Sequence, residues 1–263
     1  MRGCYIGNNR VLVSLTWGGK LIVHANDMSI SPDLIIHGIY DVPLTNFLLK
    51  NLKPHHVFVD VGANMGLFTV LAGYLVGAKG KVIAFEANIN HYELIKDNIA
   101  LNYLTGNTLV FHAAVYSTET RLTFHATERF MGNGSIVPHD DFYKNRYNVD
   151  TFQSYEVDAV ALDDVLIELP YINFVKLDIE GGEYHAFMGM QRLLEKKAIG
   201  TVIFELNKRM LGKDWFSLYS RLAEYRDLHG YSFFLLNLEG DLKPIELDAL
   251  FTLDEVPAVV MTA

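Results

Sequence analysis

Short apolar runs of five to seven residues alternate along the chain with longer segments in which apolar residues recur every three or four positions. The short runs predict buried strands, and the longer segments predict helices that cover them. The predicted strands are 57–61, 82–86, 108–112, 173–178, 201–206, 231–237 and 257–262. The predicted helices are 41–51, 66–77, 90–102, 183–197 and 214–229. This alternation indicates an α/β domain built on a parallel sheet.

The last two predicted strands are joined by residues 238–256, which show no clear helical pattern. Two strands connected without a crossover helix pair antiparallel. The sequence therefore predicts a seven-stranded, mostly parallel sheet whose last strand is antiparallel. At the start of the helix 90–102, Asn90 and Glu93 have the spacing of a capping pair.

Two segments lie outside this alternation. Apolar residues on both sides of Gly18-Gly19 predict a small β-hairpin within a β-rich N-terminal extension, residues 1–40, before a main domain over 41–263. Residues 115–172 form a polar and aromatic insertion, and a segment of this length in a compact domain usually has a function. We expect its part 115–160, together with the hairpin, to form the wall of the substrate site.

Composition and charge limit the kinds of partner and the location that we expect for the protein. The formal net charge of −9 disfavours nucleic acid, because nucleic-acid-binding proteins concentrate Lys and Arg on one face. The single cysteine, Cys4, cannot form an internal disulfide and fits a reducing, cytoplasmic location. The most apolar window, 57–77, is interrupted by Asp60 and Asn64, so no membrane span is expected. We expect a small-molecule or glycan substrate and leave the oligomeric state, including a homo-oligomer, open.

The segment Asp60-Val-Gly62-Ala-Asn64-Met-Gly66 joins the first core strand to its helix. Glycine lets the backbone turn sharply and approach a ligand, and the helix start offers free N–H groups. The segment has only two of the three glycines of a dinucleotide fingerprint, and Asp60 would repel a pyrophosphate. S-adenosylmethionine, with its sulfonium, ammonium and carboxylate groups, fits this turn better.

Acidic residues end four of the five core strands: Asp60, Glu86, Asp178 and Glu205. Ligands of open α/β sheets bind outside the carboxyl ends of the strands, so these side chains are expected at one site. Glu86 follows Asp60 by 26 residues, and its carboxylate is placed to accept the ribose hydroxyls of an adenosine.

Three carboxylates lie within Asp178-Ile-Glu180-Gly-Gly-Glu183, and three interpretations remain open. Asp178 and Glu180 are candidates for a general base acting on a substrate hydroxyl. Asp178 is equally a candidate ligand of a divalent cation, jointly with Glu205 and Asn207. Glu183 is a candidate cap of the following helix.

Two further positions lie near the predicted site. His185 falls within a turn of a strand end, and it joins the candidate catalytic residues on that ground. Tyr40 precedes the first core helix and is placed to reach a methionyl group, whereas Asp41 beside it is also a candidate helix cap.

Several of these segments together form a family pattern: 58–66, 85–88 followed by Asn98-Ile-Ala-Leu-Asn102, Ala113-Ala114, 162–164 and 175–183. With them, the chain resembles the FkbM family of S-adenosylmethionine-dependent methyltransferases over about residues 35–235. The resemblance implies the class I methyltransferase fold, a Rossmann-like sheet. It also implies O-methylation, often of sugar hydroxyls in glycans, glycolipids or antibiotics.

The resemblance also assigns roles to residues. Asp60, Gly62 and Asn64 would hold the methionyl part, Glu86 the ribose and Ala113 the adenine edge. The full set of expected cofactor contacts is Tyr40, Asp60, Gly62, Ala63, Asn64, Gly66, Glu86, Ala87, Asn88, Ala113, Ala114 and Asp178. Ala87 stands where the family usually has proline, and Gly182 where it commonly has alanine. Neither difference removes a polar group.

The sequence therefore predicts an S-adenosylmethionine-dependent O-methyltransferase, with a sugar hydroxyl of a glycan, glycolipid or glycosylated metabolite as the favoured acceptor. Two alternatives belong to other classes. One is an NAD(H)- or nucleotide-sugar-dependent oxidoreductase, which uses a similar first βαβ unit. The other is a non-catalytic module that keeps the cofactor fold.

Overall fold

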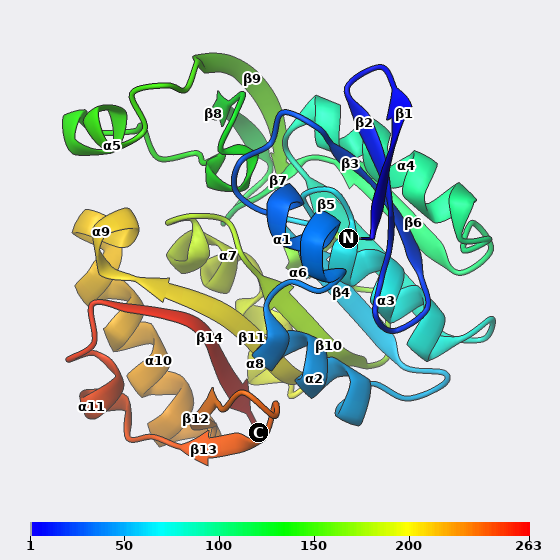
Figure 1. Cartoon of the computed structure of the whole chain (residues 1–263). Coiled ribbons are helices and arrows are strands. Elements are labelled where there is room, and N and C mark those ends of the chain that lie inside the picture. Colours follow the sequence, from blue (N-terminus) through cyan, green and yellow to red (C-terminus); the bar gives the residue numbers. More distant parts are fainter. Residues whose placement is uncertain (1) are drawn as a thin grey trace.

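The protein, described here over residues 2–263 by a computed structural model, is built around an eight-stranded sheet in the order β13-β12-β14-β11-β10-β4-β5-β6 (Figure 1). The strands are β4 Val57–Val61, β5 Lys81–Glu86, β6 Thr108–His112, β10 Ile172–Leu177, β11 Ile199–Asn207, β12 Ser232–Leu236, β13 Leu242–Pro244 and β14 Glu255–Thr262. β4, β5, β6, β10 and β11 are parallel, and β14 lies antiparallel between β11 and β12. The predicted reversed last strand is confirmed.

The eighth strand, β13, was not predicted. It is three exposed residues long and pairs with β12 at the edge of the sheet. Because all three side chains face solvent, the strand has no apolar pattern by which the sequence could reveal it.

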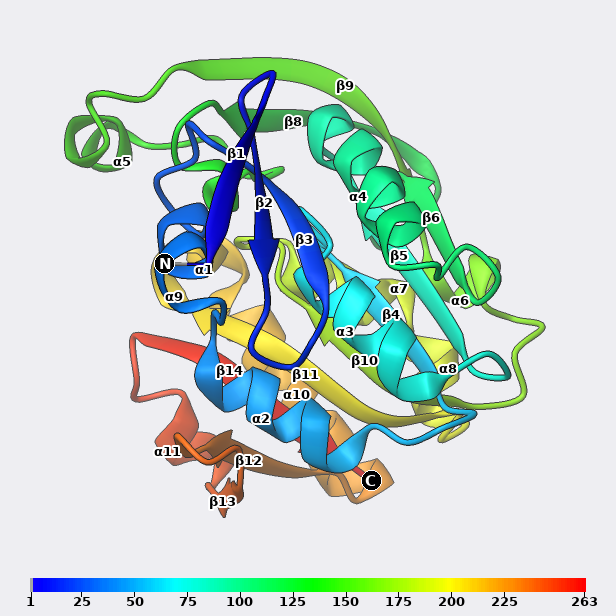
Figure 2. The ribbon, with the colours of Figure 1, turned by 45° about the vertical axis from the view of Figure 1, so that its right-hand side comes forward.

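Helices cover both faces of the sheet (Figures 1 and 2). Side chains alternate along each strand, so Phe58 and Val82 pack on one face, whereas Val59 and Val175 pack on the other. The first face is covered by α2 Val42–Asn51, α3 Leu67–Val76 and α4 Ile89–Leu101. The second face is covered by α7 Glu183–Gly189, α8 Gln191–Glu195, α10 Trp215–His229 and α11 Leu247–Leu250. Short helices α6 Leu162–Val165, α9 Lys208–Leu211 and the 3₁₀ turn η2 Gly212–Asp214 complete the connections.

Two helix predictions need correction. The predicted helix 183–197 is interrupted at Met190, so it forms α7 and α8. Gly189 lies at the interruption, where an added Cβ would stand 2.1 Å from the carbonyl oxygen of Tyr116, so only glycine allows this close contact. The cap of α4 is Asn88 rather than Asn90, since the Asn88 side chain accepts from the Asn90 backbone N–H at 3.0 Å.

The N-terminal segment forms a small antiparallel sheet of β1 Gly3–Gly7, β2 Arg10–Ser14 and β3 Lys20–His24, followed by α1 Ser31–His37. The predicted hairpin is confirmed as β2 and β3, and β1 adds a strand to it. Figure 2 shows this sheet beside α3 and α4, on the face that these helices cover.

The insertion is more regular than its polar sequence indicated. It contains β7 Ala114–Val115, β8 Thr120–Thr127, the 3₁₀ turn η1 Met131–Asn133, α5 Asp141–Arg146 and β9 Phe152–Val160. The strands form a third sheet in the order β7-β9-β8. In Figure 2, β9 crosses the top of the view from α5 to the side where β6 lies.

Within residues 2–263, no helix has the length and apolar character that a membrane crossing requires.

Candidate active site

Two adjoining cavities lie at the carboxyl ends of the central strands. The first has a volume of about 560 Å³ and the second about 660 Å³. They share Gly62, Asn64, Gly132 and Asp178, so they adjoin at the turn between β4 and α3. Every expected cofactor residue except Asp60 and Gly66 lines one cavity or the other.

Gly62 brings the turn against the end of β10. Its φ of +73° lies in the left-handed region, and a Cβ added there would stand 1.9 Å from the carbonyl oxygen of Asp178. Only glycine permits this approach. Gly66, with φ of +86°, starts α3 and shapes the same turn from outside the cavities.

Asp60 supports the turn instead of facing a ligand. Its side chain is fully buried and accepts from the hydroxyl of Thr69 at 2.7 Å. The ammonium of Lys176 lies 3.3 Å from Asp60 and 3.4 Å from Asp178, and it donates to the carbonyl oxygen of Gly62. Burial alone would lower the Lys176 pKa, but Asp178 and Asp60 raise it above its ordinary value. The expected contact between Asp60 and the methionyl group is therefore replaced by a buried ion pair.

Glu86 closes the first cavity at the end of β5. Its carboxylate accepts from the backbone N–H of Asn64 at 2.6 Å and from that of Asn88 at 2.7 Å. Burial raises the pKa of Glu86 to about 7, and these two hydrogen bonds oppose the rise. Each carboxylate oxygen keeps a lone pair for a ligand hydroxyl.

The insertion contributes residues that the sequence did not single out. Phe124, Met131, Gly132, Gly134 and Ile136 line the first cavity opposite Ala113 and Ala114. Apolar residues at 124 and 136 within a polar segment were the available signal, but nothing local indicated that they would fold over the cofactor strands.

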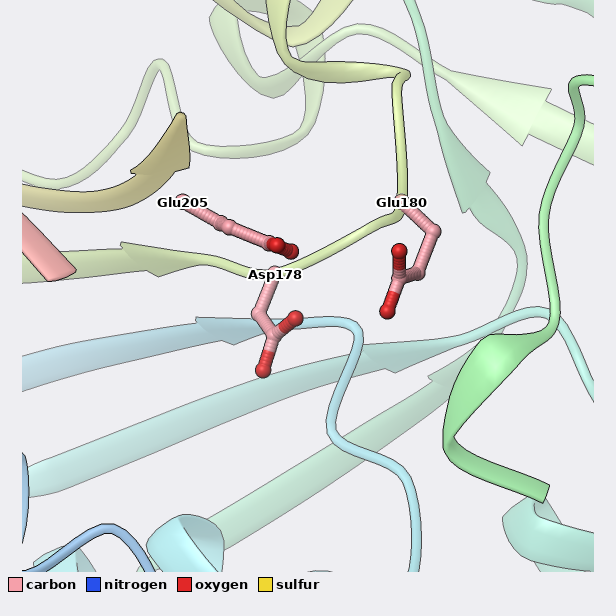
Figure 3. Close-up of side chains that lie close together, drawn as sticks. All are labelled: Asp178, Glu180 and Glu205. Carbon is pink, nitrogen blue, oxygen red and sulfur yellow. The ribbon is translucent and has the colours of Figure 1, made fainter. Parts of the chain in front are cut away.

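Asp178, Glu180 and Glu205 converge at the end of β10 and β11 (Figure 3). One oxygen of each lies within 4.8 Å of one oxygen of the others. Burial, followed by the neighbouring carboxylates, raises the pKa of Glu205 to about 10 and that of Glu180 well above its ordinary value. The three groups therefore hold at least one proton at neutral pH.

Asn207, the remaining residue of the expected metal set, lies beside this cluster. Its amide oxygen accepts from the Met210 backbone N–H and caps α9, and its amide nitrogen lies 3.4 Å from Glu205. Among the acidic groups, those of Asp178, Glu180 and Glu205 offer oxygen ligands to a divalent cation.

Glu183 holds the turn before α7 and does not cap the helix. Its carboxylate accepts from the backbone N–H groups of Gly181 at 3.0 Å and Ile179 at 3.3 Å, whereas the N-cap position of α7 is Gly182, which has no capping side chain. Burial raises the pKa of Glu183 to about 7. Asp41 does cap α2, where it accepts from the Leu44 N–H at 3.1 Å, while Tyr40 beside it lines the second cavity.

His185, a predicted catalytic residue, does not line either cavity. Its ring stacks on Tyr116 with centroids 4.2 Å apart, and its Nε2 lies 3.4 Å from a carboxylate oxygen of Asp214. Burial lowers the pKa of His185 despite this neighbour. These contacts give His185 a structural place between α7 and η2.

A large groove of about 1900 Å³ continues from the second cavity through Asn133 and Glu180. One wall carries the aromatic side chains His139, Tyr143 and Tyr147, and the other is built from residues 205–214. The guanidinium of Arg209 lies 3.6 Å from the Phe142 ring centroid and pairs with Asp140 at 2.6 Å. Residues of the insertion therefore line this groove, and their role as a substrate wall stays a prediction. The N-terminal hairpin lies outside the groove, and only its Leu21 reaches the second cavity.

The family model of the methyltransferase FkbM domain matches residues 60–233, which include the glycine turn, Glu86 and the carboxylate cluster. The chain belongs to the FkbM methyltransferase family. The predicted class I methyltransferase fold and the predicted family are therefore confirmed, and the oxidoreductase alternative was wrong. The family match identifies the domain and does not identify the molecule that accepts the methyl group.

Two methyltransferases are similar to the chain in sequence. Methyltransferase sdnD of Sordaria araneosa is 24% identical over 164 residues, covering 54% of this chain and 63% of that protein. Hexuronic acid methyltransferase AglP of Haloferax volcanii is 25% identical over 169 residues, covering 64% of this chain and 62% of that protein. The chain thus spans somewhat less than two thirds of either relative. The crystal structure of an FkbM methyltransferase from Methylobacillus flagellatus aligns with a TM-score of 0.48 and 15% identity, over 79% of this chain and 43% of that one.

Proposed function

We propose that this FkbM methyltransferase transfers a methyl group from S-adenosylmethionine to a hydroxyl group of a sugar. The observation that carries the proposal is that Glu86 and Asp178 line the same cavity, beside the turn that contains Gly62. The bound cofactor would supply an electrophilic methyl group on its sulfonium. A Cβ at residue 62 would meet the carbonyl oxygen of Asp178 at 1.9 Å, so glycine keeps the turn close to Asp178, and the two carboxylates fit such a ligand.

Glu86 is suited to the ribose. Two backbone N–H groups hold its carboxylate in place, and its free lone pairs face the first cavity. The apolar residues Phe124, Ala113 and Ile136 of the same cavity suit the flat adenine ring.

Asp178 is suited to remove the acceptor proton. Its side chain is 49% exposed and lines both cavities, whereas Glu180 and Glu205 are more buried and retain a proton. The acceptor oxygen would form its bond to the methyl carbon as the bond from that carbon to the sulfonium sulfur breaks, so that S-adenosylhomocysteine leaves and the acceptor proton passes to Asp178. The ammonium of Lys176 lies 3.4 Å from a carboxylate oxygen of Asp178 and would orient it.

The groove beyond Glu180 favours a sugar acceptor. Its aromatic wall offers flat apolar faces, and the paired Arg209 and Asp140 offer fixed hydrogen-bonding groups. The description of the Haloferax volcanii relative names hexuronic acid, which is consistent with a sugar acceptor here.

The test is methyl transfer from labelled S-adenosylmethionine to a panel of sugars, nucleotide-sugars and glycans, with Asp178→Asn as the variant. We expect labelled product with the native protein and a fall in rate of about a hundredfold or more in the variant. S-adenosylhomocysteine affinity should stay within about tenfold, or 1.4 kcal/mol. Binding of the cofactor without product on any acceptor would favour the non-catalytic module, and full activity of Asp178→Asn would remove Asp178 as the base.

A further inference from the structure

Two neighbouring histidines, His91 and His24, lie close to Glu86. His91, on α4, is only 2% exposed and lines the first cavity. Its Nδ1 lies 4.0 Å from Oε1 of Glu86. The ring of His24, on β3 of the N-terminal sheet, lies beside it with centroids 5.7 Å apart.

Both rings carry a buried nitrogen that needs a partner. The Nε2 atoms of His24 and His91 are buried and have no hydrogen-bond partner among residues 2–263. Burial lowers the pKa of His91 to about 3 and also lowers that of His24, so both rings are neutral at pH 7. A neutral imidazole has one N–H donor and one acceptor nitrogen, and leaving either unpaired in the interior is costly.

Nδ1 is the nitrogen of His91 that lies 4.0 Å from a carboxylate oxygen of Glu86, so a proton on Nδ1 has that carboxylate as its nearest acceptor. This tautomer places a donor beside a carboxylate that is already held by Asn64 and Asn88. Shortening the 4.0 Å separation would complete a hydrogen bond from His91 to Glu86.

We propose that His91, packed against His24, is a positioning residue for the cofactor, whose Nδ1–H orients Glu86 toward the ribose hydroxyls. The inference rests on the proposed function, since it takes S-adenosylmethionine as the ligand of the first cavity. It makes the N-terminal sheet a part of the cofactor site, through a side chain that no local motif singles out.

Calorimetry with S-adenosylhomocysteine tests the role of His91. We expect His91→Leu to weaken binding by about tenfold or more, while His91→Asn, which keeps an N–H donor close to the position of Nδ1, stays within about threefold. His24→Leu should weaken binding by a smaller factor. The exposed His37, replaced by Asn, is the matched control and should bind as the native protein does. In turnover, His91→Leu should raise the KM for the cofactor and leave kcat unchanged, a division that a general loss of packing would not produce.

Native affinity in His91→Leu, or equal losses in the Leu and Asn variants, would overturn the inference and leave the proposed function standing. Failure of the native protein to bind S-adenosylhomocysteine would overturn both. Nitrogen-15 spectra of the native protein give a second test, which does not require any variant to fold. We expect the Nδ1–H tautomer of His91, with a changed Nδ1 signal on addition of S-adenosylhomocysteine. An Nε2–H tautomer whose nitrogen-15 signals do not change on addition of S-adenosylhomocysteine would refute the proposed hydrogen bond.

Discussion

The side-chain amide of Asn98 on α4 pairs with both backbone groups of Ile22 on β3. Its oxygen accepts from the Ile22 N–H at 2.6 Å, and its nitrogen donates to the Ile22 carbonyl at 2.9 Å. The same nitrogen donates to the carbonyl of Met65, in the turn between β4 and α3, at 2.8 Å. Asn102, one helical turn later, pairs with Lys20 in the same way. Side chains of α4 thus hydrogen-bond to the backbone of the edge strand β3, as a neighbouring strand would. They join the N-terminal sheet to the turn between β4 and α3.

Replacing Asn98 by Leu should destabilise the protein. The side chain is fully buried, and its loss leaves backbone groups of Ile22 and Met65 unpaired, which costs about 2–4 kcal/mol in the free energy of unfolding. Urea unfolding measures this change. Asn90, exposed on the same helix, is the control, and Asn90→Ala should change stability by about 0.5 kcal/mol or less. Equal effects at the two positions would argue against the bridging role of Asn98.

Gly62→Ala should abolish cofactor binding. The added methyl group would meet the Asp178 carbonyl at 1.9 Å, so either the turn or the end of β10 has to move. Gly77 separates this steric effect from backbone strain, because its φ of +67° is also left-handed but an added Cβ has open space around it. Both alanine variants should lose about 1–2 kcal/mol through the left-handed backbone. Only Gly62→Ala should lose S-adenosylhomocysteine binding in calorimetry, and retained binding would show that the turn can relax.

Glu86 should make stability and cofactor affinity respond to pH in opposite directions. Its pKa rises from 4.5 to about 7 on folding, so between these values the folded protein binds more protons than the unfolded chain. Its contribution to the free energy of unfolding therefore falls as pH rises through this window, by an amount on the order of 3 kcal/mol. Affinity for S-adenosylhomocysteine should increase over the same window, since only the ionised carboxylate accepts both hydroxyls.

Urea unfolding and calorimetry at pH 5, 6, 7 and 8 measure both trends. Glu86→Gln should flatten the stability profile and weaken binding, whereas Glu93→Gln, at an exposed position of α4, should follow the native curves. A native profile in Glu86→Gln would mean that other groups, such as Glu183 and Glu205, account for the pH dependence.

Chelation distinguishes the two roles of the carboxylate cluster. We expect EDTA to leave the rate of methyl transfer unchanged and added magnesium not to raise it, because a proton shared by Glu180 and Glu205 already relieves the charge repulsion beside Asp178. Rates before and after chelation, and after readdition of magnesium, measure this. A loss of activity that magnesium restores would favour a divalent cation held by Asp178, Glu180 and Glu205.

Local signals in the sequence were sufficient for much of the site. The turn 60–66 and the strand ends at 86 and 178 could be recognised because glycine spacing and apolar runs directly reflect backbone geometry. The roles within the site were less accessible. Asp60 was expected to face the ligand, but Lys176, which lies far away in sequence, and Thr69 bury it. No periodicity identifies such a partner.

The insertion shows the same limit. β8 and β9 carry many exposed side chains, so they lack the continuous apolar runs by which the core strands were recognised. They are stabilised by pairing with each other across the segment that contains α5. Their position over the first cavity depends on packing of Phe124 and Val157, which local pattern does not predict.

By itself, the sequence determined the parallel core, its reversed last strand and the residues that form the glycine turn, because these follow from side-chain periodicity and turn chemistry over a few residues. Only the tertiary structure decided which polar groups meet: Asp60 with Lys176, Glu205 with Glu180, and His24 with His91. These pairs join distant parts of the chain, and their protonation depends on burial that exists only after the sheets have packed.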